Sequence, residues 1–158
     1  MATAINFASH VAANQRSSLE ALVYFNSCQN RVVDGIVDAV ERFGPLEIVQ
    51  DGERLRVRVG GLAEAQSLFA VEASSGRPIG VAVYARPDLQ HITVVHLGVA
   101  AEFASGGMRA SEQLLLRLLR ELRRSSRRIK GVRHFELYYL SGRDRANSRQ
   151  RPVAAAYA

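Results

Sequence analysis

The middle third of the chain alternates between apolar β-type segments and turn signals, and this pattern limits the fold more than any other feature. Strands are predicted at residues 46–50, 54–59, 67–73, 79–86 and 91–99. The first two flank Asp51-Gly52, a dipeptide typical of a hairpin with a type I′ turn. Short turns join most neighbouring segments, and strands joined in this way pair antiparallel. The pattern predicts a mostly antiparallel sheet.

Helical spacing is found on both sides of these strands. The first 44 or so residues are predicted to be helical, with Ser17 or Ser18 as a cap, a break near residues 28–30 and a stop at Gly44-Pro45. A second helix is predicted after Gly106-Gly107, because leucines recur there at helical spacing. They form a wide apolar stripe that is expected to be the buried face, with Leu115, Leu119 and Leu122 on it; the full stripe is Leu114, Leu115, Leu118, Leu119 and Leu122. A last strand is predicted at 134–140. Together these elements predict an α+β fold, a mixed sheet flanked by helices.

Length and charge divide the chain unevenly. A chain of 158 residues suits one domain, assigned here to 1–140, followed by an Arg-rich tail at 141–158. Residues 109–151 contain 13 basic and four acidic side chains, whereas the rest contains eight basic and 11 acidic ones. Such a basic region is a candidate surface for polyanions, and the alternative is a solvated helix face. The candidate contact residues are Arg120, Arg123, Arg124, Arg127 and Arg128.

Several classes of protein are excluded or disfavoured by composition. No segment approaches the roughly 18 apolar residues of a membrane span, and no signal peptide is visible, so a cytoplasmic protein is expected. The single cysteine, Cys28, excludes an intramolecular disulfide and a cysteine-rich zinc site. No other residues have metal-ligand spacing, so no metal is predicted. Twenty of the 21 basic residues are Arg, which favours a GC-rich, bacterial genome.

The segments between residues 68 and 139 have an order that is found in a known superfamily. They read LFAVEASSGRPIGVAVYA, HITVVHLGVAAEF, ASGGMRASEQLLLRLLREL and HFELYY. This order of hairpin, long strand, glycine loop, amphipathic helix and strand resembles the core of the GNAT superfamily of N-acetyltransferases. The resemblance implies a GNAT-like core and an atypical N-acyltransferase that uses acetyl-CoA or another acyl-CoA, with an unknown acceptor.

The resemblance also implies where coenzyme A would bind. In the family a strand end pairs with the pantetheine arm, and the glycine loop and helix N-terminus hold the pyrophosphate. The loop here is degenerate: Gly107 matches, whereas Ala104 replaces the expected Arg or Gln and Arg109 replaces Gly or Ala. Carried over position by position, the cofactor-binding residues are Leu97, Gly98, Val99, Ser105, Gly106, Gly107, Met108, Arg109 and Ala110.

Catalytic residues are not identified by the resemblance. The positions where the family places a general base on the long strand are Thr93 and Val95 here, and neither side chain is a base. His96 has the opposite strand parity and is more typical of a structural residue. Tyr138 and Tyr139 lie within the last strand rather than after it, where the family's proton donor is expected. The alternative functions are therefore a catalytically inactive GNAT-like binding or assembly protein and a basic nucleic-acid-associated protein.

The end of the chain predicts self-association. After residue 139 the family adds another helix and two strands, but only a polar and small-residue-rich segment follows here. The strand at 134–140 would then form an open edge, which favours pairing with a second copy. We expect a homodimer built on this strand, on the tail, or on both. The competing expectation is that the hairpin at 46–59 or the first helices cover the edge within one chain.

Overall fold

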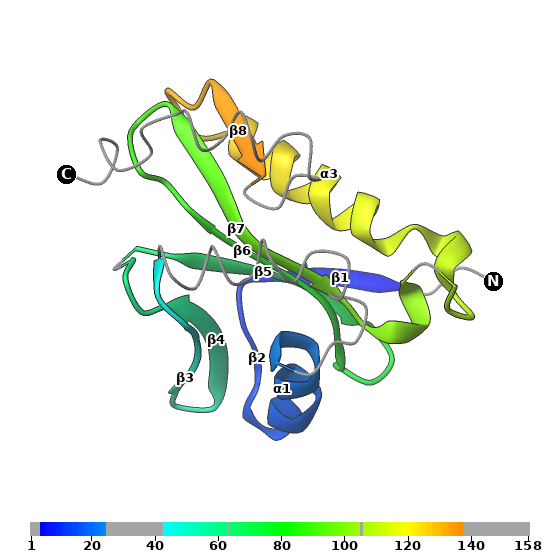
Figure 1. The fold of residues 1–158 in the computed structure, drawn as a ribbon. Coiled ribbons are helices and arrows are strands. Elements are labelled where there is room, and N and C mark those ends of the chain that lie inside the picture. The colour runs from blue at the N-terminus through cyan, green and yellow to red at the C-terminus, as the bar shows by residue number, and fades with distance from the viewer. Residues whose placement is uncertain (1–3, 25–42, 63, 105, 138–158) are drawn as a thin grey trace.

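The computed structural model describes residues 4–24, 43–62, 64–104 and 106–137 (Figure 1). The strands are β1 (Ile5–Ala8), β2 (Val11–Ala12), β3 (Leu46–Asp51), β4 (Arg54–Val59), β5 (Gln66–Glu72), β6 (Pro78–Ala85), β7 (His91–Val99) and β8 (His134–Leu137). The helices are α1 (Arg16–Tyr24) and α3 (Leu114–Arg127), with 3-10 turns η1 (Ala13–Gln15), η3 (Ala101–Phe103) and η4 (Ala110–Glu112). The α+β class and the strand positions predicted in the middle of the chain are confirmed.

The described strands form two sheets. The larger has the order β1-β5-β6-β7-β8, and all of its pairs are antiparallel except β7 with β8. Helix α3 is the crossover that makes this last pair parallel, because two parallel neighbours need a long connection. The smaller sheet has the order β2-β4-β3 and is antiparallel. The sheet is therefore mixed but mostly antiparallel, as the sequence predicts.

A hydrophobic core lies on each face of the larger sheet. On one face Leu118 and its neighbours on α3 pack against Ala70 and Ala82. On the other face Leu19 of α1 and Leu55 of β4 pack against residues of β5 and β6 such as Phe69. Figure 1 shows α3 on one side of the sheet, and α1 with the β3–β4 hairpin on the other. Alternation of side chains along each strand supplies both cores.

The prediction of helix throughout the first 44 or so residues is wrong for its beginning. Residues 5–8 form strand β1, which pairs with β5 from Ile5↔Glu72 to Ala8↔Phe69, and β2 follows at 11–12. The physical reason is that the partner strand is distant in sequence, so its hydrogen bonds override local propensity. Helix α1 begins at Arg16 after η1, so Ser17 and Ser18 lie inside it instead of capping it. Cys28 and the predicted break near it lie outside the described residues.

Two further local predictions need correction. The β3–β4 turn has Gly52 and Glu53 at its centre, because Asp51 still pairs with Arg54. Only Gly52 has a positive φ, 62°, so the turn is not type I′, and a glycine at its first central position is typical of type II′. The buried stripe of α3 consists of Leu114, Leu118, Leu122 and Ser126; Leu115 is 40% exposed and Leu119 is half-buried. The row of residues that starts at Leu114 and continues every fourth position faces the sheet. The neighbouring row, which starts at Leu115, turns away from the sheet.

The last described strand is at the end of the larger sheet. Strand β8 pairs with β7, and within the described residues nothing pairs with its other edge. The β3–β4 hairpin pairs with β2 in the smaller sheet, so the expectation that it covers β8 is wrong. Residues 138–140, with Tyr138 and Tyr139, and the tail at 141–158 lie outside the described residues. The homodimer therefore stays a prediction.

Candidate functional site

The end of β7 is the first part of the predicted coenzyme A site. Strand β8 pairs with β7 only over His91–Val94, so residues Leu97–Val99 continue past the described part of β8. On the other side, Leu97 pairs with Ala82 and Gly98 with Val81. Val83 lies opposite His96 and Tyr84 opposite Val94, which makes Val95 the extra residue of a β-bulge. The bulge directly follows the last described pair between β7 and β8, that of Val94 with Leu137.

In the loop after β7, most of the described backbone N–H groups donate hydrogen bonds to carbonyl groups of the same loop. The N–H of Gly107 donates to the carbonyl of Ala104, and that of Ala110 donates to the carbonyl of Gly107. The Arg109 N–H donates to the carbonyl of Glu102 at 2.7 Å. Three of the amides predicted to face a pyrophosphate are therefore directed into the loop in this structure. Among the described residues, no such backbone bond engages the N–H groups of Gly106 and Met108.

Gly107 matches the superfamily motif, but close packing within the loop by itself requires a glycine at this position. A Cβ atom at this position would lie 2.4 Å from the carbonyl oxygen of Ala101 and 2.5 Å from that of Glu102. Glycine is therefore required for the close approach of two backbone segments. Gly106 has a φ of 86° and open space where a Cβ would be. Gly106 and the exposed Met108 thus face solvent, whereas Gly107 closes the loop. Ser105 lies outside the described residues.

A network of four charged side chains fixes this loop to the β5–β6 hairpin. Arg77 donates to Glu102 and also lies 3.7 Å from Glu72, while Arg109 lies 3.5 Å from the same Glu72 carboxylate. A hydrogen bond from Ser75, followed by Arg77 and Arg109, lowers the pKa of Glu72, and the bond to Glu102 raises the pKa of Arg77. Sequence reasoning did not find this network, since its members are far apart in the chain and share no motif.

Helix α3 begins later than the loop motif predicts. The first helical residue is Leu114, seven positions after Gly107, and η4 fills the interval. Gln113 precedes the helix with a φ of 51°, in the left-handed region. The helix predicted after Gly106-Gly107 is confirmed, but the expectation that Glu112 lies inside it is wrong, because Glu112 belongs to the 3-10 turn η4. The N-terminus of α3 and the solvent-facing Gly106 and Met108 belong to one connection.

The two positions of β7 that correspond to the superfamily's general base are occupied by buried, non-basic side chains. Thr93 and Val95 are 7% and 2% exposed. His96 lies opposite Val83 and is 1% exposed, on the α1 side of the sheet and therefore on the other face from Leu97, as predicted. The prediction that Val95 shares the face of Leu97 is wrong, because the bulge turns Val95 to the α1 side as well. Burial lowers the pKa of His96 from 6.5 to about 4. His96 is thus a neutral core residue at pH 7, remote from the loop face.

This buried histidine predicts a loss of stability in mild acid. In the unfolded chain His96 takes up a proton near pH 6.5, but in the folded chain only near pH 4. The unfolded state therefore binds more protons between these values, so the free energy of unfolding falls as the pH drops from 6.5 to 4. The expected loss is on the order of 3 kcal/mol. Urea unfolding of wild type and His96→Leu at pH 7 and pH 4.5 measures it; equal acid sensitivity in both would contradict it.

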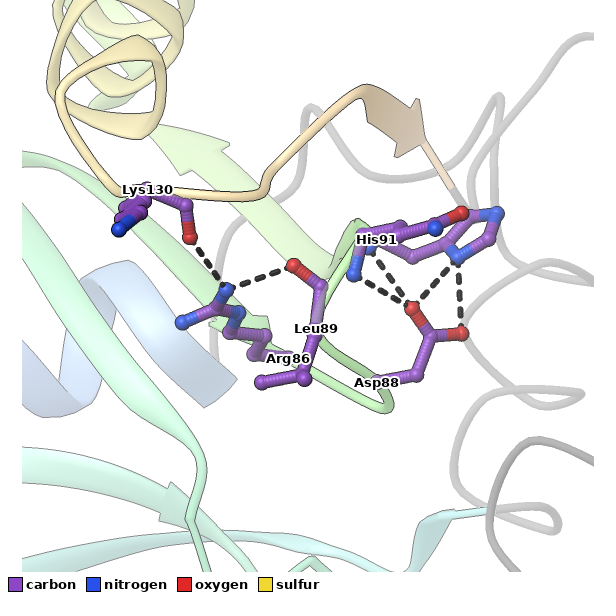
Figure 2. Close-up of polar contacts among 6 residues, drawn as sticks. Arg86, Asp88, Leu89, His91 and Lys130 are labelled. Atoms are coloured by element: carbon purple, nitrogen blue, oxygen red, sulfur yellow. Dashed lines mark hydrogen bonds and ion pairs between the residues drawn. The ribbon is translucent and has the colours of Figure 1, made fainter.

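The turn between β6 and β7 is held by a separate group of polar contacts, shown in Figure 2. Arg86 donates to the carbonyl oxygens of Leu89 and Lys130, which joins this turn to the segment after α3. The Asp88 carboxylate accepts from the His91 ring at 2.7 Å, and that bond lowers the pKa of Asp88. The His91 ring stacks on the His134 ring, with the two ring centroids 4.6 Å apart. These contacts align the first halves of β7 and β8.

A polar pocket of about 260 Å³ lies between the two sheets. It is lined by Ser9, His10, Asp51, Arg54, Leu55, Arg56, Val57, Ala65, Gln66, Ser67 and Tyr84. The Tyr84 hydroxyl donates to the Gln66 side chain at 3.1 Å, and burial raises the pKa of Tyr84. No sequence motif marks this pocket, because its residues come from five separate segments.

Comparison with known proteins shows a distant likeness to solved structures. No family model matches the sequence, and no curated protein matches it. The crystal structure of an acetyltransferase from Trypanosoma brucei is similar over 93% of this chain and 90% of its own, with 14% identity and a TM-score of 0.43. Within the described residues, no helix is long and apolar enough to span a membrane, and no group of three or more His, Cys, Asp or Glu side chains is placed to hold a metal ion.

Proposed function

We propose that this chain is an atypical N-acyltransferase of the GNAT type that binds acetyl-CoA or another acyl-CoA. The observation that carries the proposal is the connection from β7 through a glycine loop and α3 to the parallel strand β8. Within the described residues, β8 pairs with β7 up to Val94, and β7 continues to Val99 beside the loop. This is the order of elements that the superfamily uses for coenzyme A, which supports the same role here.

The proposed roles follow from the position of each residue. The backbone of Leu97, Gly98 and Val99 would pair with the amide-containing pantetheine arm. Gly106 and Met108 are exposed, and among the described residues their N–H groups make no backbone hydrogen bond, so these groups would donate to the pyrophosphate. Arg109 lies next to these residues in the loop. It would exchange its contact with the Glu72 carboxylate for one with the pyrophosphate, because a guanidinium can bind carboxylates and phosphates alike in a bidentate manner. Ser105, Gly107 and Ala110 would shape the loop.

Titration with acetyl-CoA by calorimetry tests this proposal. We expect saturable 1:1 binding by the wild type and at least a fivefold weaker affinity for Arg109→Gln. The matched control is Arg54→Gln, which removes an exposed arginine of the smaller sheet and leaves the affinity unchanged. Binding of acetyl-CoA with equal affinity by both variants would remove Arg109 from the site. No heat at millimolar acetyl-CoA would overturn the proposal.

A second candidate function is a GNAT-like protein that binds without catalysing. It is favoured by one observation, the absence of a basic side chain at Thr93 and Val95. Transfer of an acyl group to an amine requires that the amine lose a proton, and a well-placed base usually accepts it. Incubation with acetyl-CoA and a panel of amines separates the two candidates. Saturable binding without release of free thiol, measured with a thiol reagent, would favour the binding protein.

A further inference from the structure

The side of α3 that faces away from the sheet is strongly basic and continues into the segment after the helix. Seven exposed cations form this basic face: Arg120, Arg123, Arg124, Arg127, Arg128, Lys130 and Arg133. The opposite side of α3 is buried on the sheet through Leu114, Leu118 and Leu122. Figure 1 shows α3 along the outside of the molecule. The basic face is thus held in place by the core beneath it.

Acidic side chains neutralise little of this charge. Among the described residues, the one ion pair within the basic face joins Arg124 to Glu121 at 3.4 Å. Elsewhere Arg16, Arg58, Arg77 and Arg109 each have a carboxylate within 4.0 Å. Cations in the last turn of a helix stabilise it through the helix dipole, but that accounts for Arg124 and Arg127 only. The other cations of the face have no such explanation.

The shape of the basic face suits an elongated ligand. Arg120, Arg124 and Arg127 follow one side of the helix at the i, i+4, i+7 spacing, which extends over roughly 10 Å at 1.5 Å per residue. The segment from Arg128 to Arg133 continues beyond the helix end. A convex row of charges encloses no pocket for a compact anion. It can instead meet several charges that are themselves arranged in a row.

We propose that the basic face binds the phosphodiester backbone of nucleic acid without reading its sequence. Guanidinium groups bind phosphate in a bidentate manner, and each phosphate that they neutralise releases counterions. The basic face contains no aromatic side chain on which a base could stack, so backbone contact is the expected mode. Insertion into a membrane is disfavoured because the apolar side of α3 is already buried in the core. This binding does not depend on the proposed acyltransferase activity.

Fluorescence anisotropy with a labelled 20-base-pair DNA duplex tests the inference on the full chain. If about five phosphates are contacted, a plot of the logarithm of the association constant against the logarithm of salt concentration has a slope near −4.5. The affinity should then fall roughly 500-fold between 50 and 200 mM salt. We expect the double variant Arg120→Glu with Arg124→Glu to abolish binding at 50 mM salt. The matched control is Arg54→Glu with Arg56→Glu, which changes the net charge equally on the exposed side of β4.

The outcomes separate a defined surface from general attraction. Loss of binding in the α3 variant and retention in the β4 variant supports the inference. Equal loss in both variants would overturn it, because net charge alone would then account for binding. No binding by the wild type at 50 mM salt, or binding only to vesicles with 30% phosphatidylserine, would also overturn it. If circular dichroism shows that the α3 variant is unfolded, Arg120→Gln with Arg124→Gln replaces it and must weaken binding at least tenfold.

Discussion

We expect Leu118→Ala to lower the free energy of unfolding by about 3 kcal/mol, within the range for buried leucines. Leu118 is fully buried between α3 and the sheet, and its side chain reaches the backbone of β6 at Gly80. Removal of the isobutyl group would leave a cavity that α3 cannot close, because Leu114 and Leu122 hold the helix on either side. Urea unfolding followed by circular dichroism measures the change, and the midpoint temperature should fall by about 10 °C.

The matched control for this prediction lies two positions earlier on the same helix. Leu116 is 46% exposed, so Leu116→Ala should change the free energy of unfolding by less than about 0.5 kcal/mol. Both variants remove the same atoms, and alanine has the higher helix propensity in both cases. Similar losses in the two variants would show that α3 does not pack on the sheet through Leu118. The core described above between α3 and the larger sheet would then be wrong.

The second large effect is expected from Gly107→Ala, with a loss of about 3 kcal/mol. The new methyl group would lie within 2.5 Å of two carbonyl oxygens, those of Ala101 and Glu102. Both belong to the backbone of η3, which the ion pair of Glu102 with Arg77 also holds in place. The loop must therefore move as a whole to accept the side chain. Thermal unfolding of the purified variant measures the loss.

Gly60→Ala is the control for this glycine. A Cβ atom there would be no nearer than 3.4 Å to its closest neighbour, Pro45, which is ordinary contact. We expect this variant to unfold within about 1 kcal/mol of the wild type. A Gly107→Ala protein as stable as Gly60→Ala would mean that the loop has a different path. The N–H groups of Gly106 and Met108 could then no longer be assigned as the donors to a pyrophosphate.

The parts of the fold that were predicted correctly are those whose signals are local. Strands β3 to β7 have alternating or β-branched residues between turn residues, and each pairs with a neighbour in the chain except across 60–65. Strand β1 was missed, since its four residues carry no pattern and its partner β5 lies some 60 positions away. In α3 the leucine spacing predicted the helix, but its wide stripe did not show which row of leucines faces the sheet.

The candidate site was predicted only in outline, for a related reason. Gly106-Gly107 correctly marked a tight turn between β7 and α3. A glycine motif does not reveal whether its amide groups are directed outward or donate to carbonyls within the loop. That depends on contacts such as the one between Arg109 and Glu102, and on the anchoring of the loop by Glu72 and Arg77. The anchoring contacts join the β5–β6 hairpin to the loop after β7, so no sequence spacing encodes them.

Chemical-shift mapping during a titration with acetyl-CoA tests the central claim most directly. We expect saturable shifts of the backbone amides of Leu97, Gly98, Gly106 and Met108. The amides of the smaller sheet, such as Arg56 and Arg58, should stay unchanged and serve as an internal control. Shifts confined to the smaller sheet or to the pocket beside it, or no saturable shift at millimolar acetyl-CoA, would contradict the proposed acyl-CoA site.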